Sequence, residues 1–140
     1  LAVAEAHRND APNLLKVADH FRNSLYDLDT HCHKEEQVLY PYIMEMWRAH
    51  DLGQQVEAFH CGSIQGPIQV MMADHDDELA RHARIAELTN NYTAPAEADE
   101  DWREVLGLLR DFRAALEEHT AMENEVVFPM SLKLEQLAVG

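Results

Sequence analysis

Glycine, proline and cysteine are scarce in this sequence of 140 residues, which has five Gly, five Pro and two Cys. Because long stretches contain neither Gly nor Pro, helices are favoured over a fold rich in turns. The two cysteines, Cys32 and Cys61, do not make a disulfide framework for a chain of this size. Free thiols are typical of a reducing compartment, so we expect the protein to be cytoplasmic.

Long apolar runs and positive charge are scarce as well. No apolar run approaches the roughly 20 residues that span a bilayer, and no secretory signal is visible. The chain has 11 Lys and Arg against 26 Asp and Glu, which gives a net charge of −15. Because no basic surface remains to attract phosphate, we expect neither nucleic acid nor a membrane as a partner. The apolar content of 46% is enough for the core of one domain, residues 1–140.

Apolar residues recur every three or four positions along three long segments, which predicts amphipathic helices. We expect these helices over residues 13–48, 67–91 and 99–137. Pro41 is expected to kink or end the first of them, and Pro129 to kink the last. Residues 54–66 are poorly periodic and predict a connector that has room for a short helix. Residues 1–7 read like the last turns of another helix, so the sequence predicts an all-α, up-and-down four-helix bundle entered partway through its first helix.

The chain contains one motif twice. Residues 31–41 read HCHKEEQVLYP, and residues 119–129 read HTAMENEVVFP. Both copies have a histidine, a glutamate four residues later, and then valine, an aliphatic residue, an aromatic residue and proline. Residues four apart share one face of a helix, so each copy projects an imidazole and a carboxylate side by side. For a single copy, an exposed pair on a solvated helix is the simpler interpretation, but two copies within apolar stripes favour a functional site.

The apolar stripes carry polar side chains that a dry core does not tolerate without partners. These side chains are His31, Glu35, His75, His119 and Glu123, and His7 near the end of the first segment is a further candidate. A dinuclear metal site would satisfy them, with Glu35 and Glu123 as bridges and the histidines as terminal ligands. Iron, manganese and zinc all suit such ligands, and carboxylate bridges point to iron before zinc. The alternative is a structural bundle in which the histidines are only hydrogen-bonded.

Three blocks, in order, resemble the hemerythrin-like, HHE cation-binding fold, and within it the repair-of-iron-centres di-iron proteins. They are the two motif copies and, between them, residues 66–95, GPIQVMMADHDDELARHARIAELTNNYTAP. The likeness covers nearly the whole chain. It implies a non-haem di-iron centre, with two iron ions and an oxo or hydroxo bridge, in a four-helix bundle.

Through this resemblance, the family's metal ligands carry over to residues of this chain. They are His7, His31, Glu35, His75, His119 and Glu123. The resemblance also implies one more ligand histidine and a cysteine-bearing domain upstream of residue 1. Oxygen-carrying hemerythrins have a second histidine where this chain has Leu79, and aspartate where it has Glu123. Both differences weigh against a simple oxygen carrier.

The function that the resemblance implies is the repair of iron–sulfur clusters after nitrosative or oxidative damage. The partners would be small diatomic ligands, oxygen or nitric oxide, together with iron–sulfur proteins. The alternative is a module that senses, stores or carries oxygen, nitric oxide or iron without catalytic turnover. The sequence leaves open whether the chain is an enzyme, which metal it holds, and its oligomeric state.

Other polar and aromatic residues receive weaker interpretations. His82 lies on the apolar stripe of its segment, and we expect a hydrogen-bonded core histidine rather than a substitute ligand. Cys32 is expected to be a small core or interface residue, and Cys61 lies in the more exposed connector. Tyr40 and Phe128 occupy equivalent places in the two motif copies, and we expect both to cap the core beside the metals.

Overall fold

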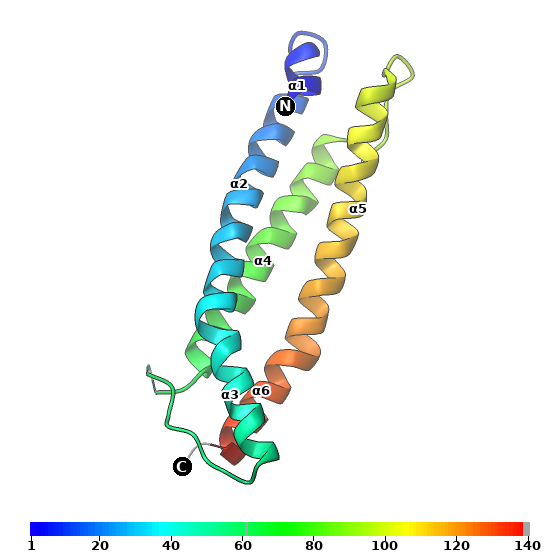
Figure 1. Ribbon diagram of the computed structural model, residues 1–140. Coiled ribbons are helices and arrows are strands. Elements are labelled where there is room, and N and C mark those ends of the chain that lie inside the picture. The colour runs from blue at the N-terminus through cyan, green and yellow to red at the C-terminus, as the bar shows by residue number, and fades with distance from the viewer. Residues whose placement is uncertain (61, 139–140) are drawn as a thin grey trace. The chain divides into compact units, whose positions relative to one another are not determined.

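The structure, a computed structural model, describes residues 1–60 and 62–138, and helices dominate that part of the chain (Figure 1). The α-helices are α1 (Ala2–Ala6), α2 (Asn13–Lys34), α3 (Tyr40–Asp51), α4 (Gln65–Leu88), α5 (Glu100–Met122) and α6 (Phe128–Ala138). Two π-helical turns, η1 (Glu35–Leu39) and η2 (Glu123–Val127), join α2 to α3 and α5 to α6. The expected all-α class is confirmed. The expectation for Cys61 lies outside the described residues.

The long helices begin and end close to the positions predicted from the sequence. Asp99 caps the start of α5, because its carboxylate accepts a hydrogen bond of 2.8 Å from the backbone N–H of Trp102. Helix α4 ends at Leu88, slightly earlier than expected. Three residues that follow have positive φ angles of 50°, 57° and 61°, namely Asn90, Asn91 and Tyr92. Residues in the left-handed region cannot continue a right-handed helix.

The irregularity expected at the two motif prolines takes the form of a π-helical turn just ahead of each. In η1 the N–H of Tyr40 donates to the carbonyl of Glu35, and in η2 the N–H of Phe128 donates to that of Glu123. Proline lacks an N–H, and in an α-helix its ring clashes with the carbonyl four residues earlier. The wider π turn accommodates the proline, so the helical path continues through both motif copies.

The chain forms two compact units, and each has its own core. Unit 1 comprises residues 1–28 and 76–118, and unit 2 comprises residues 29–75 and the segment from residue 119 onward. The buried apolar side chains of unit 1 form two clusters, one of Ala4, Leu14, Trp102 and Leu106 and one of Val17, Ile85 and Leu109. None of the described helices combines the length and the apolar content needed to cross a membrane.

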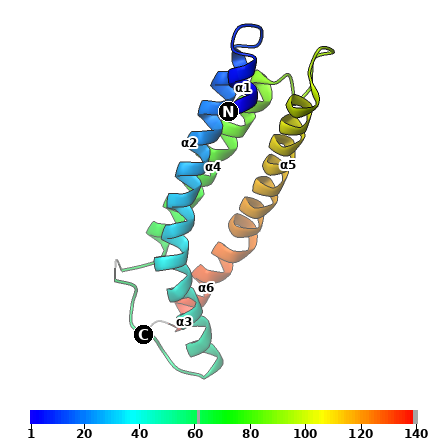
Figure 2. The ribbon, with the colours of Figure 1, turned by 45° about the horizontal axis from the view of Figure 1, so that its top comes forward.

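In unit 2, one apolar cluster joins the two C-terminal helical extensions to the connector. Its buried members are Leu39, Met46, Phe59, Ile64, Ile68, Met71, Phe128, Leu134 and Ala138. Helices α3 and α6 lie side by side in both views of the ribbon (Figures 1 and 2). Among the described residues between α3 and Gln65, where α4 begins, there is no helix, unlike the short one for which the sequence has room. Instead, Phe59 and Ile64 anchor the connector in the core.

Candidate metal centre

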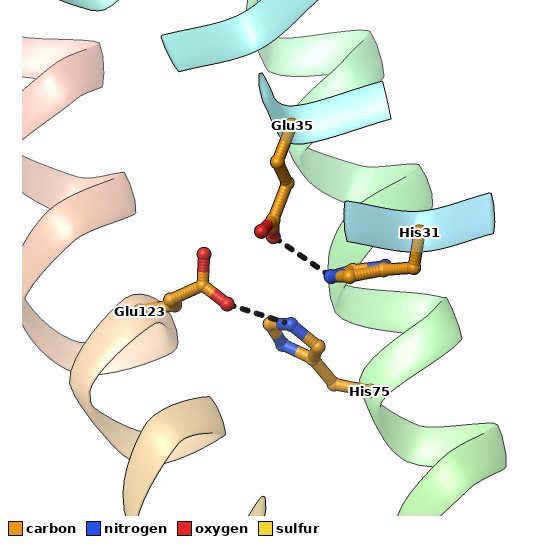
Figure 3. A group of neighbouring side chains, drawn as sticks. All are labelled: His31, Glu35, His75 and Glu123. Atoms are coloured by element: carbon orange, nitrogen blue, oxygen red, sulfur yellow. Dashed lines mark ion pairs between the residues drawn. The ribbon is translucent and has the colours of Figure 1, made fainter. Parts of the chain in front are cut away.

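Four buried side chains of unit 2 converge on one point (Figure 3). They are His31 from α2, Glu35 from η1, His75 from α4 and Glu123 from η2. Each offers one imidazole nitrogen or carboxylate oxygen, and the four atoms lie within 4.8 Å of one another. Imidazole and carboxylate together form a ligand set for a transition metal ion. The structure therefore brings together four of the residues that the sequence predicts as ligands.

The local helical geometry explains how both motif copies reach this point. His31 and Glu35 lie four residues apart on one helical face, and Nε2 of the histidine is 2.7 Å from Oε1 of the glutamate. In the second copy, Nε2 of His119 is 2.8 Å from Oε1 of Glu123. Each glutamate is the first residue of a π-helical turn. Such turns within α-helices occur frequently at functional sites.

The converging atoms are close together, but they have no hydrogen-bond partners. The atoms in question are His31 Nε2, Glu35 Oε1, His75 Nε2 and Glu123 Oε1, all of them buried. The distance from His75 Nε2 to Glu123 Oε1 is 3.1 Å, and neither atom has a hydrogen-bond partner. Buried polar atoms are rarely left without a partner. A metal ion among these atoms would satisfy all four at once, so the donor set fits a metal centre.

The other ring nitrogen of each buried histidine has a partner of its own. Nδ1 of His75 lies 2.8 Å from the amide oxygen of Asn124, and Nδ1 of His31 lies 3.2 Å from a carboxylate oxygen of Asp74. Because both partners accept, each Nδ1 can donate its proton to them, which leaves Nε2 as the ring nitrogen that faces the site. Neither partner was predicted from the sequence. The one hint in the sequence is that both partners are neighbours of predicted ligands, since Asp74 directly precedes His75 and Asn124 directly follows Glu123.

Burial and neighbouring groups act in opposite directions on the pKa values of the site. Burial lowers the pKa of His31, but its carboxylate neighbours raise it more, so the net pKa lies above the ordinary value. The pKa of His75 is raised in the same way. Burial raises the pKa of Glu123, whereas its contacts with His75, Glu35 and Tyr40 together lower it below the ordinary value. Protons on the imidazoles therefore compete with a metal ion.

Tyr40 is part of the site and does more than cap the core. Its phenol O–H donates a hydrogen bond to Oε2 of Glu123, which links the first motif copy to the second. Burial and the carboxylates of Glu123 and Glu35 raise the pKa of Tyr40, so the phenol remains a donor. Phe128, its counterpart, is buried and stacks on His75 with ring centroids 5.9 Å apart. The predicted capping role fits Phe128 and is incomplete for Tyr40.

His119 and His7 are the predicted ligands that lie outside the group of four. The side chain of His119 is 56% exposed, so its expected place on a buried stripe is wrong, although its Nε2 reaches Glu123. His7 belongs to unit 1, where its two ring nitrogens lie 3.2 Å from a carboxylate oxygen of Asp10 and 3.4 Å from one of Asp99. A metal-ligating role for His7 stays a prediction.

His82 forms a polar cluster within unit 1 together with Ser24 and Glu78, all three of them buried. The hydroxyl of Ser24 donates to a carboxylate oxygen of Glu78 (2.6 Å), and its oxygen lies 2.9 Å from Nε2 of His82. Burial, with a smaller effect from nearby arginines, lowers the pKa of His82 to about 4. The predicted hydrogen-bonded core histidine is confirmed. Cys32, in contrast, is exposed rather than part of the core.

Helical structure and a buried group of histidines and glutamates together define an all-α domain suited to binding a cation. The family model described as the hemerythrin HHE cation binding domain matches residues 1–131 of this chain. The chain therefore belongs to the hemerythrin HHE family. The resemblance inferred from the three sequence blocks is confirmed.

Curated relatives of the chain are named iron-sulfur cluster repair protein YtfE. The relative from Musicola paradisiaca (strain Ech703) is 35% identical over 111 residues, which cover 79% of this chain and 44% of the relative. The relatives from Citrobacter koseri and Escherichia coli O1:K1 / APEC are 33% and 32% identical over 124 residues, which cover 88% of this chain and 50% of each relative. The chain thus spans about half the length of these relatives.

Proposed function

We propose that this domain holds a non-haem di-iron centre and acts in the repair of iron–sulfur clusters under nitrosative or oxidative stress. Cluster repair is the role in the name of its relatives. One observation carries the proposal: the buried group of His31, Glu35, His75 and Glu123 has four converging donor atoms without hydrogen-bond partners. Buried carboxylates need compensating positive charge, and a metal ion among the imidazoles supplies it.

Within this proposal, each donor has a defined task. His31 and His75 would hold metal through Nε2, and Glu35 and Glu123 would be its carboxylate ligands, the two that can serve as bridges between ions. His119 adds an imidazole at the exposed side of Glu123. Bound iron would supply redox chemistry and open positions for small ligands such as oxygen or nitric oxide. The imidazoles are oriented by acceptors at Nδ1, and the apolar cluster of unit 2 packs against the site through the ring of Phe128.

His7 is left outside the ligand set of this proposal. Its ring nitrogens already face two carboxylates of unit 1, Asp10 and Asp99, and these interactions raise the pKa of His7. A metal ion would have to displace one of these two carboxylates from the ring before His7 could bind it.

The first test is the metal content and optical spectrum of the freshly purified chain. We expect two iron ions per chain with the absorption of an oxo-bridged ferric pair. Glu35→Ala and Glu123→Ala should each lower iron affinity by more than about 100-fold, because both remove an anionic ligand from a buried site. Glu36→Ala is the matched control, since Glu36 is exposed in the same motif copy and should not affect iron binding.

The outcomes separate the competing functions. Zinc alone, or no metal together with a thermal stability that added metal leaves unchanged, would contradict the di-iron proposal. If iron is bound, the chain is mixed with an iron–sulfur protein damaged by nitric oxide. Recovery of the cluster supports repair, whereas reversible binding of oxygen or nitric oxide without recovery would replace repair with sensing or carriage.

A further inference from the structure

Glu123 uses its two carboxylate oxygens differently. Oε1 faces two imidazoles, at 3.1 Å from Nε2 of His75 and 2.8 Å from Nε2 of His119. Oε2 accepts the hydrogen bond from the phenol of Tyr40. Because Glu123 is buried, the bulk solvent does not compete for either oxygen. A metal ion that arrives among the imidazoles therefore finds Oε1 facing it and Oε2 already engaged.

The fold fixes the phenol in this place. Tyr40 is the first residue of α3, and its backbone N–H closes the π-helical turn η1 on the carbonyl of Glu35. Helix α3 is in turn anchored by Met46, which is fully buried in the apolar cluster of unit 2. The backbone of Tyr40 is thus held in place, so the phenol leaves Oε2 only if the side chain itself rotates.

The two motif copies are not equivalent in this respect. The counterpart of Tyr40 is Phe128, which has no hydroxyl and stacks on His75 instead. A phenylalanine at position 40 would keep the aromatic ring, and the second copy has phenylalanine at the equivalent position, Phe128. The hydroxyl of Tyr40 therefore needs a reason beyond filling space, and its contact with Glu123 supplies one.

We propose that Tyr40 is a positioning residue that reserves Oε2 of Glu123, so that a first metal ion binds through Oε1 and a second ion binds only in competition with the Tyr40 phenol. This inference rests on the metal centre proposed above. A bridging carboxylate gives one oxygen to each ion, so Glu123 becomes a bridge only when the second ion displaces the phenol from Oε2. The two ions then load in order and with unequal affinity.

Cobalt(II) titration of the metal-free chain tests this order of loading. Visible absorption reports the coordination of each cobalt ion, and equilibrium dialysis with metal analysis counts the ions. The wild-type chain should take up one ion tightly and a second more weakly. In Tyr40→Phe, affinity for the second ion should rise by about 10- to 100-fold, the equivalent of one hydrogen bond to a charged group. Affinity for the first ion should change much less.

Tyr42→Phe is the matched control. It removes the same atom from the same helix, but the phenol of Tyr42 donates to the backbone carbonyl of Glu57 (2.7 Å), away from the metal ligands. Both cobalt affinities of this variant should equal those of the wild type. Thermal unfolding followed by circular dichroism shows whether each variant is folded.

The outcomes distinguish this inference from the proposal on which it rests. An unchanged or weaker second step in Tyr40→Phe would overturn the role of Tyr40 and leave the metal centre intact. Uptake of only one cobalt ion by both the wild type and Tyr40→Phe would also overturn the role of Tyr40. Absence of any cobalt binding to the wild type would contradict the metal centre itself, and the ordered loading with it.

Discussion

At the scale of single residues, His82 shows how one buried ring makes the stability of unit 1 depend on pH. The ring is fully buried, its Nδ1 has no hydrogen-bond partner, and its pKa is lowered from 6.5 to about 4. Desolvation is the main cause, and the positive charges of Arg81 and Arg113 add to it. Between pH 6.5 and about 4, His82 is therefore neutral in the folded chain and protonated in the unfolded chain.

We expect this difference to appear as a loss of stability on acidification. Between pH 6.5 and about 4, the unfolded chain binds a proton that folded His82 does not, so the free energy of unfolding falls as the pH falls. The loss from this group is at most roughly 3 kcal/mol. Urea unfolding of the metal-free chain at several pH values measures it. His82→Gln, which lacks the titrating group, should show a shallower decline.

The comparison of the wild type with His82→Gln is needed because other groups change the free energy of unfolding in the opposite direction as the pH falls. Burial raises the pKa of Glu78, and the pKa of His31 is also raised, so both add stability as the pH falls. The contribution of His31 is common to wild type and variant and cancels in the difference. Glu78 shares Ser24 with His82, so the difference also includes any change in the pKa of Glu78. His33→Gln, at an exposed position, is the control for loss of a histidine. Identical declines in wild type and His82→Gln would show that His82 does not set the pH dependence.

Which residues form the candidate site was predictable from the sequence where the same spacing occurs twice. The four-residue interval placed His31 beside Glu35 and His119 beside Glu123, and the structure has both pairs. The partners outside the motif were not predictable in this way. Whether Asp74 reaches a ring nitrogen depends on how α4 approaches α2 in unit 2, and a pattern within one helix contains no information on that approach.

At the scale of elements, the π-helical turns explain why the predicted buried stripe fails after each motif glutamate. An uninterrupted α-helical period would place Val38 and Val126, three residues after Glu35 and Glu123, on the same buried stripe, but both are exposed. The buried side chains are Leu39 and Phe128 instead. A π turn adds a residue without advancing the helical face, so every later position is shifted.

The same turns provide a prediction about the metal site. Deleting Gln37, an exposed residue of η1, in a Pro41→Ala background should convert the π turn to an α turn while α3 keeps its buried face. We expect helical content close to that of the wild type. Cobalt affinity should fall by about 10-fold or more, because the wider turn sets the direction of Glu35 toward the other ligands.

Pro41→Ala without the deletion is the control for this experiment. Its π turn should persist, because the register of α3 is fixed by core residues such as Met46, and its cobalt affinity should stay near that of the wild type. Should the deletion variant bind cobalt as tightly as the control, the π turn would only accommodate the proline and would have no part in forming the site.

At the scale of the whole molecule, the candidate metal centre lies within one of the two units. His31, Glu35, His75 and Glu123 all belong to unit 2, and the apolar clusters of unit 1 contain none of them. The class of fold was predictable at this scale, because helical periodicity and the scarcity of Gly and Pro extend over the long segments. The division into two units was not, because it depends on which side chains pack together.

Metal binding should therefore stabilise the units unequally. In hydrogen exchange followed by mass spectrometry, adding metal at 100 times its dissociation constant should slow locally opening amides of unit 2 by up to about 100-fold. Amides of unit 1 should change little. Glu35→Ala, which weakens the site, should show no such slowing. Equal slowing in both units of the wild type would mean that the whole chain opens as one cooperative block.

The distribution of the ligands along the chain has a consequence for unfolding. The four side chains come from three regions far apart in sequence, so a bound ion acts as a cross-link that closes two loops of roughly 40 and 50 residues. By the chain-entropy argument used for disulfides, each closure would restrict the unfolded ensemble by roughly 4 kcal/mol if the ion stayed attached. A metal-loaded chain would then unfold to a coil with two closed loops. Removing the metal with a chelator would open these loops, as a reducing agent opens a loop closed by a disulfide.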